Sequence, residues 1–490
     1  MLTLNAENPI RTKHEMPPLA FFYISQMQIK KVPNGGDTRP KIEGRTVTSV
    51  FRPMKRGPHY RPGNVRTTKL LLRMLWQFLI NLPAILELRK IYKNRKKNAE
   101  DISVIFYSDN LDEINGIANS LRSVVPFLKS KGKCVQLWGS AFNTRACGVV
   151  EDSFVVLFPR CASMEQLGYA DSELAYPYLV PVLKFLKRYP ADLMELETPS
   201  PGAWLVGLTA RIVGLRVIGN YRTDVPSYTR SLVKEAWMRR YVLGYMRIFY
   251  QNTTPVISPC EAYRKILETE IKVKPSLIKV LPRGIPLERF SPSFRNASAK
   301  NELVRFLYVG RVSAEKSIVF LEKLWKEFCT ENEGAELVFV GGGWYLDTLK
   351  ENLKDCPNVK FMGVRIGREL AELYANADFF LFPSGSDTFG NVVVESLASG
   401  TPAIVSDMGG PQDIINNAEK KCGWVLPFEN LEEWKKQLKK CCEMLSAPEY
   451  EEIRLAAVAH SKNYTLEKMA EAQWEFFKEL LYPCSAKQPR

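Results

Sequence analysis

Histidine is scarce in this chain of 490 residues, which contains only His14, His59 and His460. Its ten cysteines are scattered along the sequence, and none of them forms a C-x-x-C pair. This pattern argues against a zinc site made of histidine and cysteine and against a disulfide framework, and it fits a reducing compartment. We therefore expect no resident metal ion.

Long apolar runs are missing too, because no uninterrupted apolar stretch reaches the roughly 18 residues of a conventional membrane span. The first twenty residues lack the basic and then apolar order of a secretion signal. With 46% hydrophobic and 25% charged residues, the composition is that of a globular protein and not of a coiled coil or a disordered chain. The length suits two or three domains.

Acidic residues are few in one part of the chain only. Residues 1–99 hold 20 Lys and Arg against 5 Asp and Glu, whereas residues 100–490 hold 48 of each sign. The whole formal net charge of +15 therefore lies in this basic extension. Such a distribution predicts a local binding surface and not a property of the whole protein.

The extension contains a mostly apolar stretch, and we predict a helix over about 69–97. Arg73, Gln77 and Asn81 fall four residues apart and would form one narrow polar stripe, with apolar residues around the rest. Pro83 should kink or end this helix. A basic run follows the apolar stretch, and an apolar helix beside clustered cations suits the surface of an anionic membrane.

Two other interpretations of this helix stay open. It could pack on the domain as a core helix with solvated flanking charges. Nucleic acid would accept the charge, but it gives no reason for a helix so rich in Trp and Leu, and we do not expect it as a partner. We expect a chain without residues 1–98 to keep the rest of its fold.

From residue 102 onward, short apolar runs alternate with helical stretches, which is typical of buried parallel strands joined by helices. The first series of strands is expected at Ile102–Tyr107, Val135–Trp138, Phe154–Phe158, Leu193–Leu196 and Val217–Tyr221. The second is expected at Val304–Val309, Glu336–Val340, Asn358–Met362, Asp378–Phe382 and Pro402–Ser406. Two such series predict an α/β fold of two facing, doubly wound (Rossmann-like) domains.

The expected domain boundaries follow from these series. After the extension at 1–99 come a first domain at 100–295, a second at 296–465, and a C-terminal helix in 466–490 that packs back on the structure. The Pro-rich segment near 284–301 is the candidate hinge. Ligands of such folds bind at the carboxyl ends of the strands, so the site is expected in the cleft between the domains.

Glycines and cations follow three of the predicted strands. Asn115-Gly116 opens a helix, and glycine there lets a phosphate approach the helix N-terminus, although any strand-to-helix turn uses glycine too. In L-Y-V-G-R-V-S-A-E-K (307–316) a strand ends at Gly310. Arg311 and Lys316 can then both point into the cleft, where two cations suit a diphosphate. The glycines of V-F-V-G-G-G (338–343) either bring backbone close to a ligand or make a tight turn.

The most specific stretch begins F-P-S-G-S-D-T-F-G-N-V-V-V-E at residue 382. A helix should start near Gly390, with Asp387 in the loop before it and Glu395 two turns later. An acid in that loop can accept hydrogen bonds from sugar hydroxyls, and a second acid can clamp a ribose diol. The backbone N–H groups of Thr388, Phe389 and Gly390 lie in the same loop.

Together these motifs resemble family 4 of the retaining glycosyltransferases, which have the GT-B fold. The resemblance covers about 100–482 and rests on V-G-R-x-S-x-E-K followed by D-T-F-G-N-V-V-x-E-x-x-A-S-G-x-P. The sequence is most similar to the glycolipid-forming branch of sulfoquinovosyl- and mannosyltransferases. That similarity rests on T-P-S-P-G (198–202), Y-R-T-D-V-P-S-Y (221–228) and P-R-G-I-P-L-E-R-F-S-P (282–292).

The resemblance implies roles for these residues. Arg311 and Lys316 would bind the donor diphosphate, and Gly116 would contact it from the first domain. Asp387, in the first place of the family's E-x7-E motif, would bind the transferred sugar, and Glu395 would hold the ribose. The other donor-binding residues implied are Gly310, Thr388, Phe389, Gly390 and Asn391.

The reaction implied is front-face transfer with retention, in which the leaving phosphate takes the proton of the acceptor hydroxyl. Charge stabilisation by cations and backbone dipoles would be the main catalytic contribution. The family pattern requires no metal, and the nucleotide sugar serves as co-substrate with no further cofactor.

Two residues depart from the family pattern. Asp387 is shorter than the usual Glu, which would alter the sugar preference or only shift the backbone. Arg222 replaces the His of the family's Y-H-T-D, and no histidine lies between residues 60 and 459 to substitute for it. Arg222 either supplies a permanent positive charge to the sugar-phosphate, as a fourth catalytic residue, or leaves the site impaired.

The function implied is transfer of a hexose-type sugar from a nucleotide-diphosphate sugar to a lipid acceptor. The enzyme would be attached peripherally to the cytosolic face of a membrane through residues 69–97. Two alternatives come from other classes. A GT-B-like nucleotide-sugar epimerase fits the two domains but not the E-x7-E-like loop, and a degenerate, non-catalytic membrane scaffold is motivated by Arg222.

Overall fold

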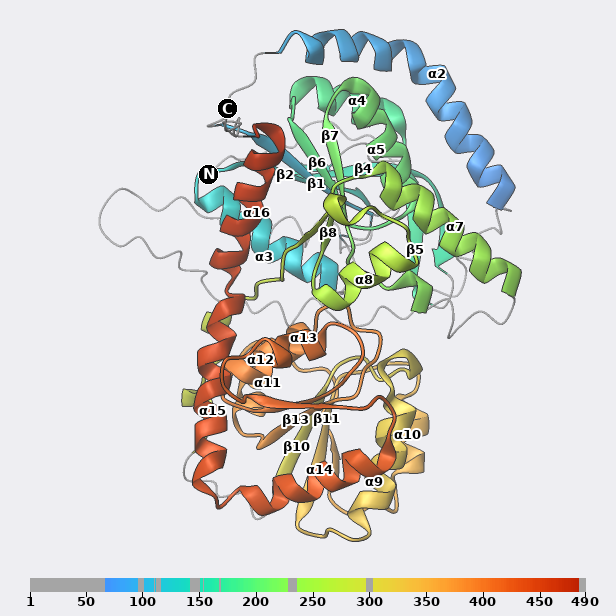
Figure 1. The fold of residues 1–490 in the computed structure, drawn as a ribbon. Helices are drawn as coiled ribbons and strands as arrows, with labels where there is room; N and C mark the ends of the chain where they lie inside the picture. The colour runs from blue at the N-terminus through green and yellow to red at the C-terminus, as the bar shows by residue number, and fades with distance from the viewer. Residues whose placement is uncertain are drawn as a thin grey trace, which may run out of the picture.

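The computed structural model of the chain describes residues 67–95, 101–109, 111, 116–141, 150–152, 154–166, 169–227, 236–296 and 303–483. These residues form two α/β domains, one above the other in Figure 1, and each domain is built on its own sheet. The predicted fold class, two doubly wound domains, is confirmed. Most of the basic extension, residues 1–66, lies outside the described residues.

The first sheet has the strand order β3-β4-β2-β1-β6-β7-β8-β9, with β5 paired to β4. Strands β3 and β5 run antiparallel to β4, and the other neighbouring strands are parallel. The strands are β1 Ser103–Ser108, β2 Cys134–Ala141, β3 Val150–Asp152, β4 Val155–Gln166, β5 Tyr169–Pro177, β6 Leu193–Leu196, β7 Arg216–Asn220, β8 Val256–Ser258 and β9 Ile278–Val280.

All five strands predicted for this sheet are present, close to the expected bounds. Four others were not predicted. Strands β3, β8 and β9 have three residues each, which is too short for a periodic pattern to stand out. Strand β5 carries the polar sequence Y-A-D-S-E-L-A-Y-P, which has no continuous apolar run.

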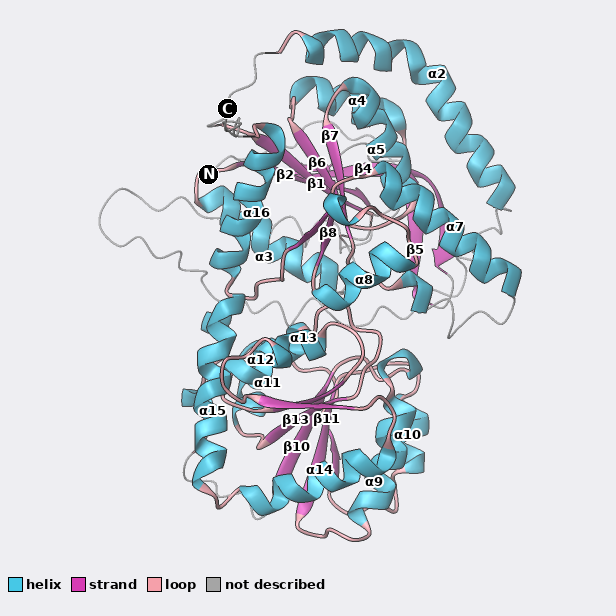
Figure 2. Ribbon diagram, in the orientation of Figure 1, coloured by secondary structure: helices cyan, strands magenta, loops and turns pink. Residues whose placement is uncertain are grey.

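Helices cover both faces of this sheet (Figure 2). Helices α3 and α16 bury their apolar side chains on one face, and α2, α4, α5, α7 and α8 on the other. The C-terminal helix therefore packs on the first domain, although it follows the second domain in sequence. The helices are α2 Thr67–Lys93, α3 Gly116–Ser130, α4 Leu179–Arg188, α5 Pro201–Val213, α7 Ala236–Asn252, α8 Glu261–Thr269 and α16 Leu466–Leu481.

Helix α2, which arcs over the first domain in Figure 1, is partly a core helix and partly exposed. Ile85, Leu88 and Tyr92 are buried in the same cluster as α4 and α5, and Tyr92 Oη donates to Leu186 O at 2.9 Å. Of the two outcomes expected at Pro83, the helix does not end there but continues to Lys93, close to the predicted bounds of 69–97. Among the described residues, no helix combines the length and apolarity needed to cross a bilayer.

The buried part of α2 bears on our expectation for a chain without residues 1–98. Removing residues 1–98 would uncover the apolar partners of Ile85, Leu88 and Tyr92 on the first domain. Exposed apolar surface of that kind is unfavourable in water, by about 25 cal/mol per Å². Substitutions on the exposed side of α2 are therefore a better test of its role than deletion.

The second sheet is wholly parallel, with the order β12-β11-β10-β13-β14-β15. Its strands are β10 Val304–Val309, β11 Ala335–Val340, β12 Val359–Phe361, β13 Phe379–Phe382, β14 Ala403–Ser406 and β15 Gly423–Leu426. The first five correspond to predicted strands. Its helices are α9 Ile318–Cys329, α10 Leu346–Asn352, α11 Gly367–Ala375, α12 Asn391–Ala398, α13 Pro411–Asn416, α14 Leu431–Met444 and α15 Pro448–Ser461.

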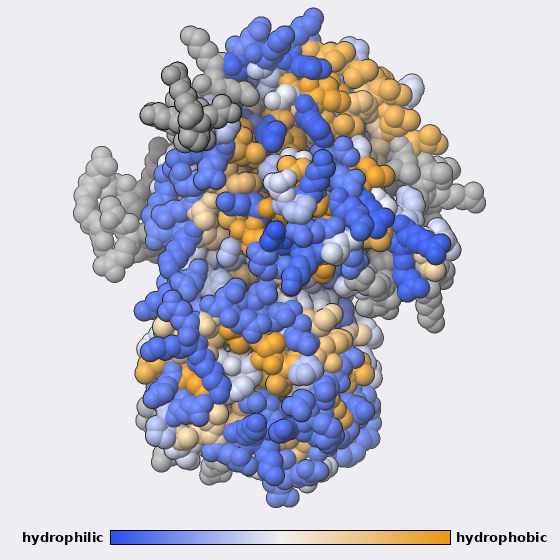
Figure 3. Space-filling model, in the orientation of Figure 1, coloured by the Kyte–Doolittle hydropathy of each residue, from blue (hydrophilic) through white to orange (hydrophobic). Residues whose placement is uncertain are grey.

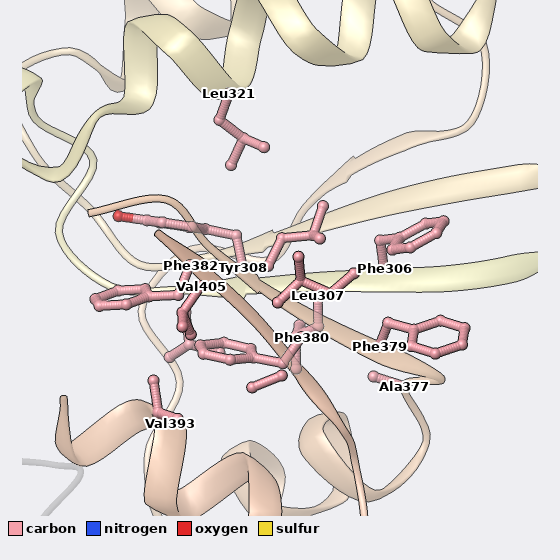
Figure 4. Packing of buried hydrophobic residues seen from close by; sticks show 14 of the residues in the cluster. Phe306, Leu307, Tyr308, Leu321, Ala377, Phe379, Phe380, Phe382, Val393 and Val405 are labelled. Carbon is pink, nitrogen blue, oxygen red and sulfur yellow. The ribbon is translucent and has the colours of Figure 1, made fainter. Parts of the chain in front are cut away.

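Aromatic residues fill the core of this second sheet, as Figure 4 shows for β10 and β13. The rings of Phe306 and Phe379 stack with their centroids 5.6 Å apart, and Tyr308 stacks on Phe382. These strands are buried on both faces, which explains why they could be predicted as continuous apolar runs. A rigid core of this kind holds the strand ends, and the loops that follow them, in fixed positions.

The chain passes between the two domains twice, and the two passages are hydrogen-bonded to each other. Ile285 N donates to Tyr464 O at 2.9 Å, and Leu466 N donates to Ile285 O at 3.1 Å. The backbone of Gly284 lies so close to Thr465 that a Cβ atom would overlap the carbonyl oxygen of that residue. Part of the segment that we proposed as the hinge is thus paired with the return passage.

Candidate functional site

The loop after β10 brings one of its two cations directly to the acid of the facing loop. Lys316 Nζ lies 2.8 Å from Asp387 Oδ2, and both side chains are mostly buried. Arg311 is more exposed, and its Nη1 lies 3.6 Å from Glu315 Oε1. Lys316 and Asp387 therefore form the centre of the site on the second domain, and Arg311 lies close to it along the chain.

Glycines allow the loops after β10 and β11 to pack against each other. Gly341 has a positive φ of 142°, and a Cβ atom there would overlap Gly310 O. A Cβ atom on Gly343 would likewise overlap the carbonyl oxygen of Val312. The predicted alternatives for V-F-V-G-G-G were approach to a ligand and a tight turn, but these two glycines are required for another reason, the close approach of one loop's backbone to the other's.

The loop that carries Asp387 leads into α12 as predicted. Gly390 has a positive φ of 98° and occupies the N-cap position, so the helix begins at Asn391. Asp387 is a buried acid, and burial raises its pKa, but the charge and hydrogen bond of Lys316, together with the charge of Arg283, lower it below its ordinary value. The site therefore holds Asp387 as a carboxylate at neutral pH.

Glu395 lies on the second turn of α12, eight residues after Asp387. Its Oε2 accepts a hydrogen bond from Tyr374 Oη at 3.0 Å. Burial raises the pKa of Glu395 to about 7, although the hydrogen bond from Tyr374 and the charge of Arg289 partly oppose this shift. Near neutral pH this carboxyl therefore changes between its charged and neutral forms.

On the first domain, Arg222 is held just after β7 at the interface with the second domain. Its guanidinium forms an ion pair with Glu197, which follows β6, and donates to Ser120 Oγ of α3 at 3.1 Å. Its backbone oxygen accepts from Thr388 Oγ1 at 2.8 Å. The sequence-predicted residues Arg222 and Thr388 are thus in direct contact across the cleft.

Arg283 is a further cation at this interface, and sequence reasoning did not single it out. Its Nη2 donates to Arg222 O and to Thr388 Oγ1, both at 3.2 Å. Burial and the nearby charge of Arg222 lower the pKa of Arg283 to about 9, although the charges of Asp387 and Glu197 oppose the shift. The sequence feature that could have identified Arg283 is its place in the P-R-G-I-P run that begins at residue 282.

Gly116 is the first residue of α3, and among the described residues no atom lies within 4 Å of the place where its Cβ would be. The backbone is therefore open on that side, which suits the close approach of a ligand. The turn before it, with Asn115, lies outside the described residues. Of the remaining predicted residues, Phe389 is buried against Tyr464, and Asn391 has a buried Oδ1 without a hydrogen-bond partner in the described chain.

A group of polar side chains that we did not predict lies at the carboxyl ends of β1 and β2. Asp109 directly follows β1 and is buried, and Arg160 of β4 donates to Ser140 O at 3.4 Å. Tyr107 Oη lies 3.3 Å from Ser140 Oγ. Buried polar groups at strand ends of an open α/β sheet mark the usual position for a ligand.

The described residues include no group of three or more His, Cys, Asp or Glu side chains placed to hold a metal ion. Charge in the part of the site that they form is supplied by Arg222, Arg283, Arg311 and Lys316 against Glu197, Glu315 and Asp387, with Glu395 changing its charge near neutral pH. Two of the cations, Arg311 and Lys316, follow the same strand β10, which suits a ligand with more than one negative charge. The bound partner most consistent with this arrangement is a diphosphate.

Two family models match the chain. The model "Glycosyltransferase Family 4" matches residues 114–289, and "Glycosyl transferases group 1" matches residues 291–454. The two segments meet near residue 290, at the first passage between the domains.

Two of the relatives are enzymes whose names state the product that they form or the sugar that they transfer. Alpha-monoglucosyldiacylglycerol synthase of Streptococcus pneumoniae is 29% identical over 318 residues, which is 61% of this chain and 70% of the relative. Sulfoquinovosyl transferase SQD2 of Arabidopsis thaliana is 26% identical over 322 residues, which is 64% of this chain and 61% of the relative. Among solved structures, Anabaena HepE in complex with UDP-glucose has a TM-score of 0.58 at 17% identity, over 77% of this chain and all of that chain.

Proposed function

The chain belongs to the family 4 glycosyltransferases of the GT-B fold, and we propose that it transfers a hexose-type sugar from a nucleotide-diphosphate sugar to a lipid acceptor with retention. The main observation in support of the donor site is that Lys316 contacts Asp387 in the loop before α12. Glu395 lies eight residues after Asp387, within that helix. The relatives named for glucosyl-diacylglycerol and sulfoquinovosyl products support the glycolipid class.

The donor would lie with its diphosphate at the loop after β10. Lys316 and Arg311 would neutralise the charge that grows on the phosphates as the sugar leaves, which is the largest catalytic contribution expected of such a site. Glu395 would accept hydrogen bonds from the ribose hydroxyls, and Asp387 from the hydroxyls of the transferred sugar. In the retaining reaction, the acceptor hydroxyl attacks on the face that the phosphate leaves, and the phosphate takes its proton.

The acceptor headgroup would lie on the first domain, at the carboxyl ends of β1 and β2. Asp109 and Ser140 supply acceptors and Arg160 supplies donors there, which suits the hydroxyl groups of a polyol. This position faces the donor side through Arg222, whose backbone contacts Thr388. A headgroup rich in hydroxyls is the acceptor chemistry that we propose.

Helix α2 would hold the enzyme on an anionic membrane surface. Leu72, Trp76 and Ile80 are 64%, 66% and 61% exposed, and Figure 3 shows the hydrophobic surface gathered over this helix at the top right. The polar Gln77 instead faces the domain, where its Oε1 accepts from Leu179 N at 2.9 Å. Gln77 faces the domain beside Met74 and Phe78, whereas the side with Leu72, Trp76 and Ile80 is open, and lipid is the environment that would cover that apolar side.

The exposed residues of helix α7 support the same proposal, that this side of the first domain meets the membrane. Trp237, Tyr241 and Ile248 are exposed on one side of it, and its sequence contains three arginines and no acid. Trp and Tyr beside cations are typical of the membrane–water interface. Helices α2 and α7 both pack on the same face of the first sheet, so one lipid surface could meet both.

A direct assay tests the reaction. The protein is incubated with a panel of UDP-, GDP- and ADP-sugars and a lipid extract, and products are identified by mass. A lipid heavier by one sugar residue, with the α-linkage of the donor retained by NMR, is the expected result. Tight nucleotide binding by calorimetry without any product would contradict the transfer reaction, and absence of nucleotide binding would favour a non-catalytic scaffold.

Flotation with liposomes tests the membrane surface. The triple variant Leu72→Ser, Trp76→Ser and Leu79→Ser removes exposed apolar side chains without touching the buried half of α2. It should lose most of its binding to liposomes that contain anionic lipid. Trp344→Ser is the matched control, because Trp344 is 69% exposed on the second domain and should leave flotation unchanged.

A further inference from the structure

Arg222 is buried although its guanidinium is permanently charged. Its Nε forms an ion pair with Glu197 Oε2, and its Nη1 donates to Ser120 Oγ at 3.1 Å. Its backbone oxygen accepts hydrogen bonds from Thr388 Oγ1 and Arg283 Nη2. Both the main chain and the side chain of Arg222 are therefore fixed by specific partners.

Glu197 is completely buried directly after β6. Its backbone N–H donates to Tyr107 O at 3.0 Å, so its position is set by the neighbouring strand β1. Apart from the ion pair with Arg222, neither carboxylate oxygen has a hydrogen-bond partner in the described part of the chain. A buried charge without a partner is strongly unfavourable, so each member of this pair depends on the other.

A second buried acid, Glu195, lies two residues earlier and has other partners. Its Oε1 accepts from Asn220 Nδ2 at 2.6 Å, and its Oε2 accepts from Gln473 Nε2 at 2.7 Å. Burial and the negative charge of Glu197 raise the pKa of Glu195 well above its ordinary value. The negative charge of these two neighbouring acids is therefore held on Glu197, next to the guanidinium.

We propose that Glu197 is the positioning residue for Arg222, and that the two side chains work as a charged pair where the family pattern has a histidine at position 222. This inference rests on the proposed transfer reaction. Glu197 is too buried to touch the sugar itself, so it acts through Arg222. It keeps the guanidinium in one orientation and balances its charge, which leaves the donor diphosphate to Arg311 and Lys316.

A double-mutant cycle on turnover tests this proposal. Glu197→Gln keeps the shape of the side chain and removes its charge, Arg222→Gln removes the cation, and the double variant removes both. Glu197→Gln should lower kcat about tenfold or more and change KM for the donor by less than about threefold, the pattern of a lost interaction in the transition state. In the Arg222→Gln background the same change should cause no further loss, and Glu197→Asp should restore part of the activity.

Asp192→Asn is the matched control, because it alters another buried carboxyl of the first domain, whose ion pair is with Arg95 and whose hydrogen bond comes from Ser103 N. Its effect on kcat should be additive with that of Arg222→Gln. Unchanged kcat in Glu197→Gln, or equal losses from Glu197→Gln in both backgrounds, would overturn the proposal. A purely structural role would instead lower the midpoint of thermal unfolding and leave kcat of the folded protein unchanged.

A failure of this proposal can be distinguished from a failure of the proposed function. If the wild-type chain forms no glycosylated product, the proposed function fails, and the cycle is read from calorimetric affinities for UDP-glucose relative to UDP. Coupling between positions 197 and 222 in that ratio would support the pair. Additive effects there would overturn it.

Discussion

Single residues of the site are arranged in pairs of opposite charge. Lys316 meets Asp387, and Arg222 meets Glu197, so the donor would enter a site whose charges already have partners. Arg283 adds a partly buried cation that contacts both domains. This arrangement preorganises positive charge near the phosphate position and limits the reorganisation needed when the sugar leaves.

The two cations after β10 are expected to matter most for turnover. Lys316→Ala and Arg311→Ala should each lower kcat/KM for the donor by about 10²-fold or more, because charge stabilisation at the leaving phosphate is lost. Lys326→Ala is a suitable control, since Lys326 pairs with Glu322 elsewhere on the same domain. Steady-state kinetics measure the effect, and near-normal activity in both site variants would mean that the phosphates lie elsewhere.

The pKa of Glu395, raised by burial to about 7, predicts a pH dependence of nucleotide binding. Only the carboxylate accepts two hydrogen bonds from a ribose diol, so affinity for UDP should be highest above pH 7. It should weaken as the pH falls through about 7, by up to about tenfold for each further pH unit. Calorimetry across this range measures the profile.

Two variants check the assignment of that profile. Glu395→Gln should lose the part of the pH dependence centred near pH 7 and keep only that of the terminal phosphate of UDP, whose second pKa is about 6. Tyr374→Phe removes a hydrogen bond that lowers the pKa of Glu395, so the midpoint should move to higher pH. The same pH profile for wild type and Glu395→Gln would show that Glu395 does not contact the ribose.

Sequence spacing could place Asp387, Lys316 and Glu395, because the loops that carry them follow strands that are easily recognised. It could not place Glu197 or Tyr374 as partners. Glu197 contacts Arg222 only because β6 and β7 are neighbours in the sheet, and Tyr374 reaches Glu395 from a different helix. Such contacts depend on strand order and helix packing, which a single sequence does not specify.

Among the elements, the parallel strands that are buried on both faces could be predicted from the sequence. The side of α2 that faces the first domain could not. The polar stripe of Arg73, Gln77 and Asn81 was recognised, but Gln77 turns toward α4, where Leu179 N needs an acceptor. The orientation of a helix is set by such a partner and not by its own sequence alone. The core interpretation holds for the part with Ile85, Leu88 and Tyr92, whereas the part with Leu72 and Trp76 is exposed.

Gly284 provides a test of the paired passages between the domains. In Gly284→Ala the new Cβ would overlap Thr465 O and lie 2.8 Å from Leu466 Cα, so the two passages would have to separate. We expect a loss of stability of about 1–3 kcal/mol, seen as a lower midpoint of thermal unfolding. Gly334→Ala is the control, because no atom of the residues that the structure describes lies within 4 Å of its Cβ position. Equal midpoints for wild type and Gly284→Ala would indicate that the passages are not held together.

For the whole molecule, the net positive charge is concentrated in the N-terminal part of the sequence, which suggests that the two domains face different environments. Residues 1–99 carry the entire net charge of +15, whereas the part with both sheets is neutral overall. Exposed cations of α2, such as Arg89, Lys90 and Lys93, lie next to its apolar surface. A protein of this kind should meet an anionic membrane with its first domain and leave the second domain toward the aqueous nucleotide-sugar pool.

Salt should separate the two contributions to this attachment. At about 1 M salt the screening length falls to about 3 Å, so the electrostatic part, about 1 kcal/mol for each cation, is lost while the apolar part remains. Wild type should therefore bind anionic liposomes more weakly in high salt without full release. The triple variant at Leu72, Trp76 and Leu79 should be released completely, and Arg89→Gln/Lys90→Gln/Lys93→Gln should bind weakly at low salt with a shallower salt dependence. If the apolar variant followed the wild-type salt curve, the lipid contact would have to lie away from α2, and the exposed side of α7 would be the next surface to substitute.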